Sequence, residues 1–509
     1  MRDTLVEWLA QSRLHHAEAE AVVQGERRLS YQQLWQEVLR VARHLLDAGL
    51  QRQDRVALLM ENSPEYIAAY YGVLAAGGAV VALNSAVKAP EINNWIRHSE
   101  ARFLFADGDH PELAAVMADN GASLQVITTH AVEGALAWDD LPRETDEEHI
   151  TGIQHAADDL AAIIYTSGTT GDPKGVMLSH HGLRSNISSI LAYLKLDHTD
   201  SIVNVLPFYY SYGNSVLHTH IAVGGRLVLE NSLMYPHQVV QRMVDEKVSG
   251  FSGVPSTFAL LLNRVKLQDY DLGSLRYLTQ AGGPMSPAHI QRLKSALPQC
   301  DIIIMYGQTE ASARLTWLPP DRLEEKLGSA GIPIEGVSIE IRDEQGQPVP
   351  RNTVGEIYAR GDNLMKGYWK NPQATEKVLI DGWLKTGDLA RMDEEGYIFI
   401  QGRNSDMIKA GANRISPREI EEVIQELDSV AEVVVVGVPD ELLGEAIKAV
   451  VVPASDTQPD RRQVLAHCRA RLAIYKIPKH VEFVDSLPKT ASGKIKRYML
   501  VNPCNQEVK

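Results

Sequence analysis

The sequence predicts an α/β protein with a large N-terminal domain of helix-flanked sheets, a small β-rich subdomain, and a small mobile C-terminal α+β domain. Three observations predict it. Apolar runs of strand length alternate with helical patterns as far as Tyr306, turn-rich antiparallel patterning begins at Val337, and a separate strand-and-helix pattern follows Gly402. With 509 residues, 44% of them hydrophobic, the chain can form a large core and more than one domain.

The N-terminal part contains the alternating pattern. Because strands that alternate with helices form parallel sheets covered by helices, we expect layered α/β architecture here. The expected helices include 63–76 and 235–248. The expected strands are 55–60, 79–83, 102–106, 124–128, 160–165, 201–208, 275–279 and 302–306.

The C-terminal third changes character twice. Two strand-like segments, 337–342 and 355–360, flank a turn-rich stretch and predict an antiparallel pair. Beyond Gly402, we expect a compact α+β domain with helices at 416–427 and 461–473 and strands at 431–438 and 446–452. The predicted domains are therefore 1–402 and 403–509. Since no long Pro/Gly linker joins them, we expect a short hinge at 403–406.

Composition excludes several classes of protein. The formal net charge of -15 argues against a nucleic-acid partner, because phosphate backbones are bound through excess Lys and Arg. The three cysteines, Cys300, Cys468 and Cys504, encode neither a disulfide framework nor a zinc site. The first residues lack the apolar stretch of a signal peptide, and no run is long enough to span a membrane. We expect a cytoplasmic protein without a transmembrane segment.

A cluster of glycines, hydroxyls and one lysine occupies 165–175. It follows an apolar run typical of a buried strand, so backbone N–H groups at the strand end are available to an anion. It lacks Walker spacing, because Pro173 precedes Lys174 and Gly175 follows. By itself the run also fits a surface turn. The candidate phosphate-binding residues are Thr166, Ser167, Gly168, Thr169, Thr170, Gly171 and Lys174.

Four further motifs follow in order: Tyr-Gly-Gln-Thr-Glu at 306–310, Lys-Thr-Gly-Asp at 385–388, the segment 402–420 that opens with Gly-Arg, and Pro-Lys-Thr-Ala-Ser-Gly-Lys at 488–494. With the 165–175 loop, this ordered set resembles the superfamily of adenylate-forming enzymes, which includes acyl-CoA synthetases, luciferases and peptide-synthetase adenylation domains. The resemblance covers essentially the whole chain and is closest to acyl-CoA synthetases.

The resemblance implies a site for ATP and Mg²⁺. Attack of a carboxylate on the α-phosphate brings two anions together, so cations must offset their repulsion. By resemblance, the 165–175 loop wraps the departing pyrophosphate, Thr309 contacts phosphate, and Glu310 binds Mg²⁺, which prefers oxygen ligands. Helix capping is the structural alternative for this Thr-Glu pair. The resemblance places adenine and its phosphates beside Tyr306, Gly307, Gln308, Gly282, Gly283 and Pro284, although the last three also form a simple turn signal.

Two residues near the predicted domain junction resemble the family's ribose-binding groups. Asp388 matches an aspartate whose two oxygens accept from both ribose hydroxyls. Arg403 matches an arginine near ribose and phosphate. A turn aspartate and a surface arginine are the competing interpretations.

The C-terminal lysine, Lys494, matches a family residue that enters the active site during adenylation and bridges the carboxylate and the α-phosphate. We predict Lys494, Thr309 and Glu310 as the catalytic residues. The resemblance also implies that the small domain rotates, withdraws this lysine, and brings the loop around Gly411 to the pantetheine arm of coenzyme A. Ser405 stands where many relatives carry Asp or Lys, which leaves the energetics of the hinge open.

The acyl pocket is predicted at Tyr209, Tyr210, Tyr212 and Gly213, where the family often has a histidine at the position of Tyr210. Tyrosines are equally common as core residues. No Asp or Glu occurs between Ser201 and Leu229 to pair a substrate ammonium, whose burial would be costly. We therefore expect a fatty or aryl acid without an α-amino group.

The sequence favours an ATP-dependent carboxylic acid:CoA ligase (AMP-forming), which uses ATP, Mg²⁺ and coenzyme A. One alternative is an enzyme that loads the acyl group onto the phosphopantetheine of a carrier protein, since both acceptors present the same thiol. Another is a regulatory protein that binds nucleotide without catalysis. The intact Lys174, Glu310, Asp388 and Lys494 argue against the last.

Overall fold

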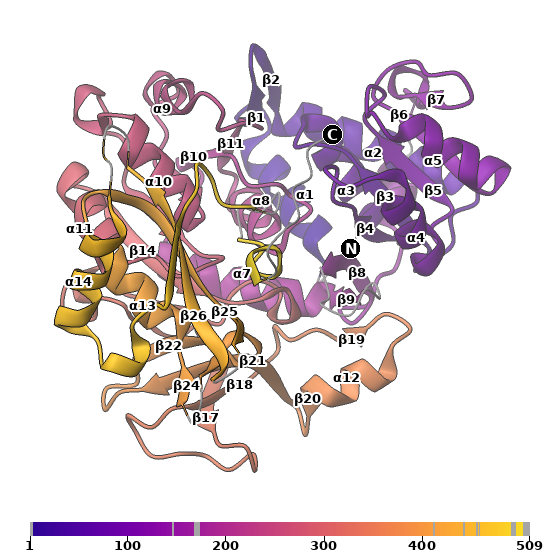
Figure 1. The fold of residues 1–509 in the computed structure, drawn as a ribbon. Coiled ribbons are helices and arrows are strands. Elements are labelled where there is room, and N and C mark those ends of the chain that lie inside the picture. The colour runs from indigo at the N-terminus through magenta and orange to yellow at the C-terminus, as the bar shows by residue number, and fades with distance from the viewer. Residues whose placement is uncertain are drawn as a thin grey trace.

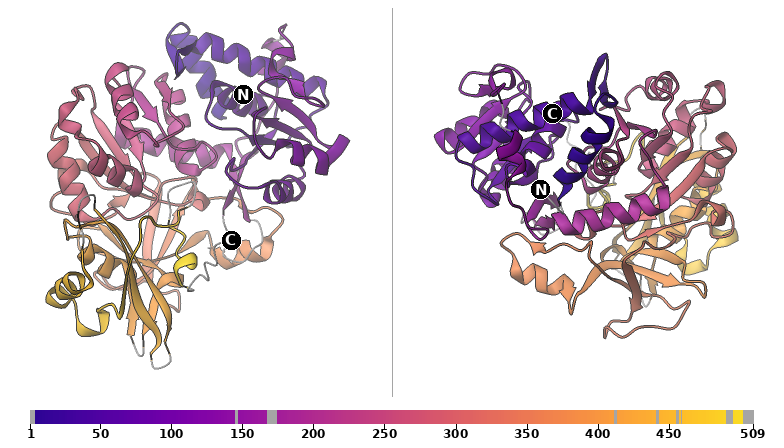
Figure 2. Two further views of the ribbon diagram at one scale, coloured as in Figure 1. Left: turned by 45° about the horizontal axis from the view of Figure 1, so that its top comes forward. Right: turned by 180° about the vertical axis from the view of Figure 1, so that it is seen from behind.

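The computed structural model describes residues 4–144, 147–166, 174–410, 413–440, 443–454, 457, 459–489 and 495–501. The predicted site residues Ser167, Gly168, Thr169, Thr170, Gly171, Gly411 and Lys494 lie outside the described residues. Figures 1 and 2 show two helix-covered sheets in the indigo-to-pink part of the chain, an orange β-rich subdomain, and a yellow C-terminal domain beside it. The predicted fold class is confirmed.

The first sheet has nine strands in the order β16-β15-β14-β13-β12-β10-β11-β1-β2. Its central strands are parallel, and β2, β15 and β16 add antiparallel edges. The strands are β1 (Glu20–Gln24), β2 (Arg27–Ser30), β10 (Ser201–Asn204), β11 (Arg226–Leu229), β12 (Gly250–Gly253), β13 (Tyr277–Gln280), β14 (Asp301–Tyr306), β15 (Thr316–Trp317) and β16 (Ile332–Pro333).

Helices cover both faces of this sheet, because alternate strand residues point to opposite sides. Ile302 and Ile304 of β14 belong to one core cluster, whereas Ile303 and Met305 belong to another. The first face packs on α9 (Pro236–Asp245), α10 (Pro255–Arg264) and α11 (Pro287–Ala296). The second packs on α7 (His180–Leu194) and α8 (Ser211–Val223), with α1 (Leu5–His16) beside α8.

The second sheet has eight strands in the order β19-β9-β8-β4-β3-β5-β6-β7. One face packs on α2 (Tyr31–Asp47) and α3 (Pro64–Ala75), and the other on α4 (Ala89–Ser99) and α5 (Leu113–Asn120). A short α6 (Glu147–Thr151) lies beside α2. The strands are β3 (Arg55–Leu59), β4 (Ala79–Ala82), β5 (Phe103–Ala106), β6 (Gln125–Thr128), β7 (Leu136–Ala137), β8 (Leu160–Thr166), β9 (Lys174–Ser179) and β19 (Gly367–Tyr368).

The β-rich subdomain is an antiparallel sheet in which β17 and β18 pair as predicted. A helix, α12 (Pro372–Val378), lies beside β20 and β21. The strands are β17 (Val337–Arg342), β18 (Gly355–Gly361), β20 (Leu379–Ile380), β21 (Trp383–Met392) and β22 (Ile398–Arg403).

The C-terminal domain has the predicted α+β composition, with its own core around Ile420, Val435 and Val464. It contacts the rest of the molecule where α13 meets β22 and where β25 meets α10. Its elements are β23 (Ile408–Ala410), β24 (Asn413–Ile415), α13 (Pro417–Ile424), β25 (Val430–Asp440), β26 (Gly444–Pro453), α14 (Arg461–Arg471), β27 (His480–Phe483) and α15 (Tyr498–Val501).

One predicted strand is too long. The segment 201–208 forms a strand only over β10, because Asn204 turns its amide back to donate to Leu206 O at 2.9 Å and the chain then leaves the sheet at Pro207. This departure carries Tyr209 and Tyr210 to the start of α8. A short 3-10 turn (Asn404–Asp406) occupies the predicted hinge, whose motion stays a prediction.

Candidate active site

Tyr306, at the end of β14, lies against two charged residues of the subdomain. Its phenol donates to Asp388 Oδ2 at 2.6 Å, and Arg403 Nε lies 3.4 Å from Asp388 Oδ1. Burial, followed by the field of the Asp388 carboxylate, raises the pKa of Tyr306 well above its usual value, so the phenol stays a donor. Each carboxylate oxygen has two lone pairs, so Asp388 can accept further hydrogen bonds from a ligand.

The loop after β14 folds back tightly on itself. A Cβ on Gly307 would lie 2.0 Å from Ala313 O, so only glycine fits this close approach. The turn brings Thr309 and Glu310 into a 3-10 helix, Thr309–Ala311. Thr309 Oγ1 lies 3.2 Å from Ser211 Oγ at the start of α8. The motif therefore sits between the nine-stranded sheet and α8.

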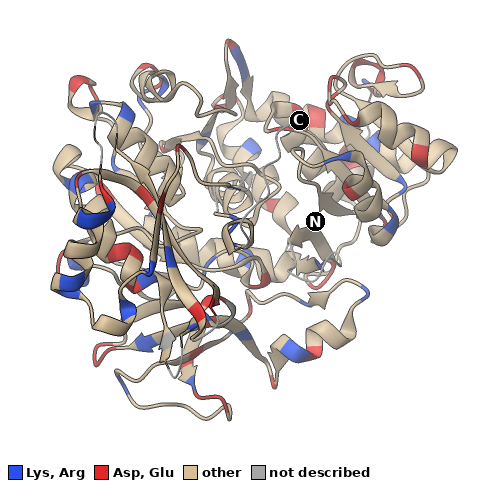
Figure 3. Cartoon of the chain, viewed as in Figure 1, with Lys and Arg blue, Asp and Glu red and all other residues tan. Residues whose placement is uncertain are grey.

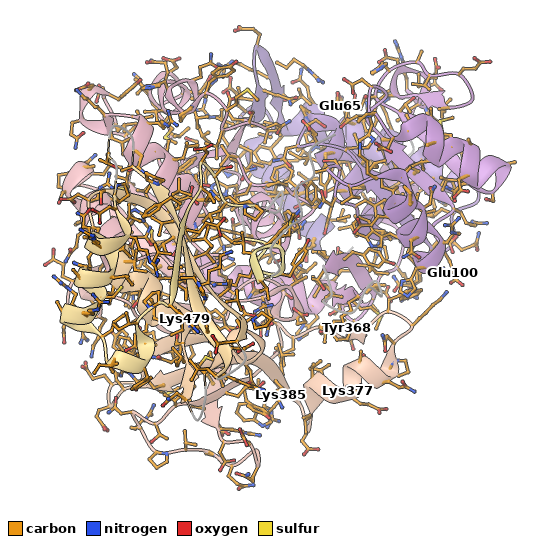
Figure 4. All side chains as sticks on the ribbon, in the orientation of Figure 1. Glu65, Glu100, Tyr368, Lys377, Lys385 and Lys479 are labelled. Atoms are coloured by element: carbon orange, nitrogen blue, oxygen red, sulfur yellow. The ribbon has the colours of Figure 1, made fainter. Side chains whose placement is uncertain are left out.

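Glu310 is held by a residue that the sequence analysis did not single out. Tyr368 of β19 donates its phenol hydrogen to Glu310 Oε1 at 2.8 Å, and Lys174 Nζ lies 5.6 Å from the centre of the Tyr368 ring. Figure 4 shows Tyr368 between the N-terminal sheets and the subdomain that carries Lys385. Tyr368 thus lies between the carboxylate of Glu310 and Lys174, the first residue of β9.

The two described ends of the predicted phosphate loop face one another. Thr166 closes β8 and pairs across the antiparallel ladder with Lys174, which opens β9. Thr166 Oγ1 donates to Lys174 O at 3.5 Å, a long contact. The segment 167–173, which contains the predicted loop residues, therefore joins two adjacent strands of the eight-stranded sheet, β8 and β9. The second of these strands, β9, also pairs with β19.

The segment Gly282-Gly283-Pro284 follows β13, next to β14 in the sheet. Gly282 has φ +87, a left-handed conformation that favours glycine. Gln280 Nε2 donates to Gly283 O at 2.8 Å, which fixes the turn. Two buried amide atoms in this region, Gln280 Oε1 and Gln308 Nε2, have no protein partner among the described residues. Unpaired buried polar groups are costly, so these two atoms are candidates for hydrogen bonds to a polar ligand.

The predicted acyl-pocket residues are brought together at the start of α8. The rings of Tyr209 and Tyr210 lie 4.7 Å apart, and Tyr210 OH accepts from Asn84 Nδ2 at 3.2 Å. Tyr212 OH donates to Thr279 O at 2.8 Å. A Cβ on Gly213 would lie 2.2 Å from Pro207 O, so this glycine permits the sharp entry into the helix.

Two buried histidines of α8 are each paired with a tyrosine. His218 Nδ1 lies 2.7 Å from Tyr71 OH, and His220 Nε2 lies 3.0 Å from Tyr277 OH. Burial lowers the pKa of His218 to about 3 and that of His220 to about 4, so both are neutral. Within the described part of the chain, no group of three or more His, Cys, Asp and Glu side chains has the arrangement of a metal site.

Charged residues lie mainly outside the strands of the two N-terminal sheets. In Figure 3 the strands of the two N-terminal sheets are largely tan, and blue and red residues lie mainly on helices and loops. Three cations lie beside residues of the site: Lys174 near Tyr368, Arg403 near Asp388, and the buried Arg314 behind Gly307. Arg314 and Ser211 are further residues that sequence reasoning missed, although both lie within or just beyond recognised motifs.

Comparison with known proteins agrees with this arrangement. The family model for AMP-binding enzymes matches residues 9–369, and the model for the AMP-binding enzyme C-terminal domain matches residues 419–494. The chain is 36% identical to a feruloyl-CoA synthase of Amycolatopsis sp, with 94% of each chain covered. It is 31% identical to a long-chain-fatty-acid–CoA ligase of Bacillus subtilis, covering 93% of this chain and 90% of the relative.

A solved structure shows the same fold. The anthranilate CoA ligase AuaEII in complex with anthranoyl-AMP superposes with a TM-score of 0.90 at 27% identity, covering 98% of this chain and 96% of the other. Among the described residues, no helix is long and apolar enough to cross a bilayer. The chain belongs to the AMP-binding enzyme family, which is part of the adenylate-forming superfamily, and within that superfamily it groups with the acyl-CoA synthetases.

Proposed function

We propose that the protein is an ATP-dependent carboxylic acid:CoA ligase that works through an acyl adenylate. In the first half reaction, a carboxylate oxygen of the acid attacks the α-phosphorus of ATP and pyrophosphate leaves. In the second, the thiolate of coenzyme A attacks the acyl carbonyl and AMP leaves. The observation that carries the proposal is the meeting of Tyr306, Asp388, Arg403 and the Thr309-Glu310 turn at the end of one parallel strand, where ligands of open α/β sheets bind.

We assign the nucleotide to this strand end. Asp388, oriented by Tyr306 and Arg403, is suited to accept from the ribose hydroxyls. The unpaired Gln280 Oε1 and Gln308 Nε2 provide an acceptor and a donor beside the adenine position that we propose at 282–284. Thr166, Lys174 and the loop between them would bind the pyrophosphate.

Glu310 fits a magnesium ion, because its carboxylate presents oxygen and Tyr368 occupies Oε1 with only a single hydrogen bond. When bound, Mg²⁺ would offset the charge of the phosphates and of the leaving pyrophosphate. Glu310 would hold the metal ion at this position. Thr309, next to Ser211, places its hydroxyl beside the proposed position of the phosphates.

Lys494 and the 403–406 turn complete the proposal. We assign Lys494 to the contact between the carboxylate and the α-phosphate during adenylation, and Gly411 to the pantetheine approach after the small domain rotates about 403–406. A lysine that reaches the reacting atoms favours the transition state because it offsets charge as it develops.

We propose an aryl or fatty acid without an α-amino group as the substrate, in the pocket bounded by Tyr209, Tyr210, Tyr212 and Gly213. The relatives named above act, by their names, on an aryl acid and on fatty acids. We also propose a cytoplasmic location and no nucleic-acid partner, in keeping with the net charge of -15 and with Cys300 and Cys468, which are both buried and unpaired.

The test is product analysis with a panel of aryl and fatty acids, ATP and Mg²⁺, and either free coenzyme A or a phosphopantetheinylated carrier protein. We expect AMP, pyrophosphate and an acyl-CoA thioester in equal amounts. Thioester on the carrier alone would favour the carrier-loading alternative. ADP and phosphate as products, or no reaction with any acid, would overturn the ligase.

A further inference from the structure

One buried tyrosine, Tyr368, contacts two opposite charges of the proposed site. Glu310 and Lys174 are both partly buried, and within the described residues neither forms an ion pair. The Tyr368 phenol donates to Glu310 Oε1 at 2.8 Å, and Lys174 Nζ lies over the Tyr368 ring, 5.6 Å from its centre. Tyr368 itself is 6% exposed. The hydroxyl and the ring of one side chain therefore contact the carboxylate and the ammonium separately.

The backbone around Tyr368 is tied to both sides of the site. Met365 N donates to the backbone oxygen of Glu310 at 2.8 Å, and Trp369 N donates to the backbone oxygen of Gly175 at 2.7 Å. Gly175 is the second residue of β9, which pairs with β19 in an antiparallel ladder. The short segment 365–369 thus spans the distance between the carboxylate motif and the strand that follows the phosphate loop.

Contacts with the next helix and with α4 fix this segment. Tyr368 N donates to Thr375 Oγ1 of α12 at 2.9 Å, and Trp369 Nε1 donates to His98 O of α4 at 3.0 Å. Gly367 has φ +136, and a Cβ there would lie 2.9 Å from Thr375 Cγ2, so glycine is needed for this close approach. The tyrosine ring is therefore held by its own backbone rather than by the charges that it contacts.

A direct pair between the two charges would compete with the proposed ligands. A carboxylate and an ammonium that are partly withdrawn from water attract each other more strongly than in bulk water. Such a pair would occupy acceptor sites that a hard cation needs, and it would have to break before Lys174 could contact pyrophosphate. The phenol of Tyr368, in contrast, donates one hydrogen bond to one oxygen of Glu310, and a carboxylate has about four acceptor sites.

We propose that Tyr368 is a positioning residue for adenylation, which keeps Glu310 and Lys174 apart so that each is ready for its own ligand. The proposal rests on the ligase function proposed above and assigns separate tasks to the two parts of one side chain. The hydroxyl orients Glu310 toward the magnesium ion, and the ring holds the ammonium of Lys174 by a cation–π contact. Groups that are oriented before the nucleotide binds need no rearrangement during the reaction.

The first test measures metal binding without turnover. The enzyme is saturated with α,β-methylene-ATP, which cannot release pyrophosphate, and titrated with Mn²⁺, whose free concentration is read by electron paramagnetic resonance. Tyr368→Phe keeps the ring and loses the hydrogen bond to a charged group, so we expect the Kd for Mn²⁺ to rise about tenfold. In turnover, the Mg²⁺ concentration for half-maximal activity should rise by the same factor, while KM for the acid stays within about twofold.

Tyr397→Phe is the matched control for this substitution. Tyr397 is also a buried tyrosine whose ring lies beneath a lysine, since Lys326 Nζ is 4.8 Å from its centre, but it is outside the proposed site. The variant should bind Mn²⁺ as the wild type does. A tyrosine that served only to fill space would behave like this control, because phenylalanine fills nearly the same volume.

The second test removes the ring. In Tyr368→Leu, Lys174 can approach Glu310, and we expect the Kd for Mn²⁺ to rise about a hundredfold. Adding Lys174→Met should bring the Kd back to about the tenfold increase of Tyr368→Phe, because the competing ion pair is gone. In the wild-type background, Lys174→Met should change the Kd by less than about threefold, since no such pair exists there to be broken.

Three outcomes overturn the proposal. If Tyr368→Phe binds Mn²⁺ as tightly as the wild type, the hydroxyl does not orient Glu310, and the ligase function stands. If Lys174→Met has the same effect in both backgrounds, the ring does not separate the charges, and the ligase function again stands. If the wild type binds no Mn²⁺ in the presence of α,β-methylene-ATP, the proposed function fails as well. Tyr368→Phe decides the question even where Tyr368→Leu fails to fold.

Discussion

The phenol of Tyr306 donates to Asp388 Oδ2 at 2.6 Å, across 82 residues of sequence. This bond joins the end of β14 in the nine-stranded sheet to β21 of the subdomain. It orients a carboxylate at a strand end, and a carboxylate oxygen accepts more than one hydrogen bond. The nucleotide site that we propose is therefore built from two sheets, and its geometry depends on how they pack.

Tyr306→Phe removes the donor without removing the ring. We expect KM for ATP to rise about tenfold to a hundredfold, because a hydrogen bond to a charged group is lost and Asp388 is less well oriented. Steady-state pyrophosphate release at varied ATP measures this. Tyr270→Phe is the control, since its phenol has the exposed His237 as its hydrogen-bond partner, away from the site. Equal KM values in Tyr306→Phe and the wild type would mean that Asp388 does not need this bond.

Gly307→Ala tests the tight return of the loop. The new Cβ would lie 2.0 Å from the backbone oxygen of Ala313, so the loop that carries Thr309 and Glu310 must shift. A misplacement of about 1 Å costs on the order of a hundredfold in rate, and we expect that loss in kcat for adenylation. Gly273→Ala, next to only the flexible end of Asp271, should retain full activity. A fully active Gly307→Ala enzyme would contradict the role of the turn.

Glu310→Gln keeps the shape and removes the charge. The amide oxygen can still accept from Tyr368, whereas affinity for a hard cation should fall. We expect the Mg²⁺ concentration for half-maximal activity to rise at least about tenfold, as for the loss of one charged ligand interaction. Titration with Mg²⁺ at fixed ATP measures it. Glu395→Gln, a surface carboxylate paired with Arg322, is the control, and an unchanged Mg²⁺ requirement in Glu310→Gln would remove Glu310 from the metal site.

The environment of the Asp107 carboxyl group predicts that the stability of the protein depends on pH. Burial raises its pKa to about 6, while its Oδ2 accepts from Glu61 N at 2.7 Å. Because the folded-state pKa lies above the unfolded value, the stabilisation is complete below the unfolded pKa and is lost as pH rises through about 6. Asp107→Asn should therefore raise the melting temperature at pH 8, by about 2 °C or more, and give no gain near pH 4.

Thermal unfolding at the two pH values measures this difference. The exposed Asp321→Asn serves as the control and should shift neither melting temperature. A gain for Asp107→Asn at low pH and none at high pH would reverse the sign and contradict the assignment.

Much of the fold could be predicted because local patterns and the tertiary structure agree. The strands predicted at 79–83, 102–106 and 302–306 match β4, β5 and β14 within one residue at each end. The strand predicted at 201–208 is too long, because the apolar composition continues after the backbone leaves the sheet at the end of β10. Only the Asn204 side chain and Pro207 mark that exit, and their effect depends on tertiary contacts.

The site was predicted where residues lie within motifs and missed where the fold supplies them. Tyr368 is separated from Glu310 by 58 residues, and nothing in its own surroundings indicates the contact. Arg314 lies just past the Tyr306–Glu310 motif, where an arginine is usually a solvated residue. Arg314 is buried because the loop after β14 folds back and brings the backbone of residues 313 and 314 against Gly307. The sequence alone does not show this contact. The positions of the loop at 167–171, Gly411 and Lys494 stay predictions.

The formation of an acyl adenylate is tested most directly by exchange of labelled pyrophosphate into ATP without coenzyme A. We predict exchange that requires both the acid and Mg²⁺. In Lys494→Ala we predict that exchange falls about a hundredfold or more, whereas thioester formation from a supplied acyl adenylate is largely retained. Absence of acid-dependent exchange in the wild type, across aryl and fatty acids, would contradict the account.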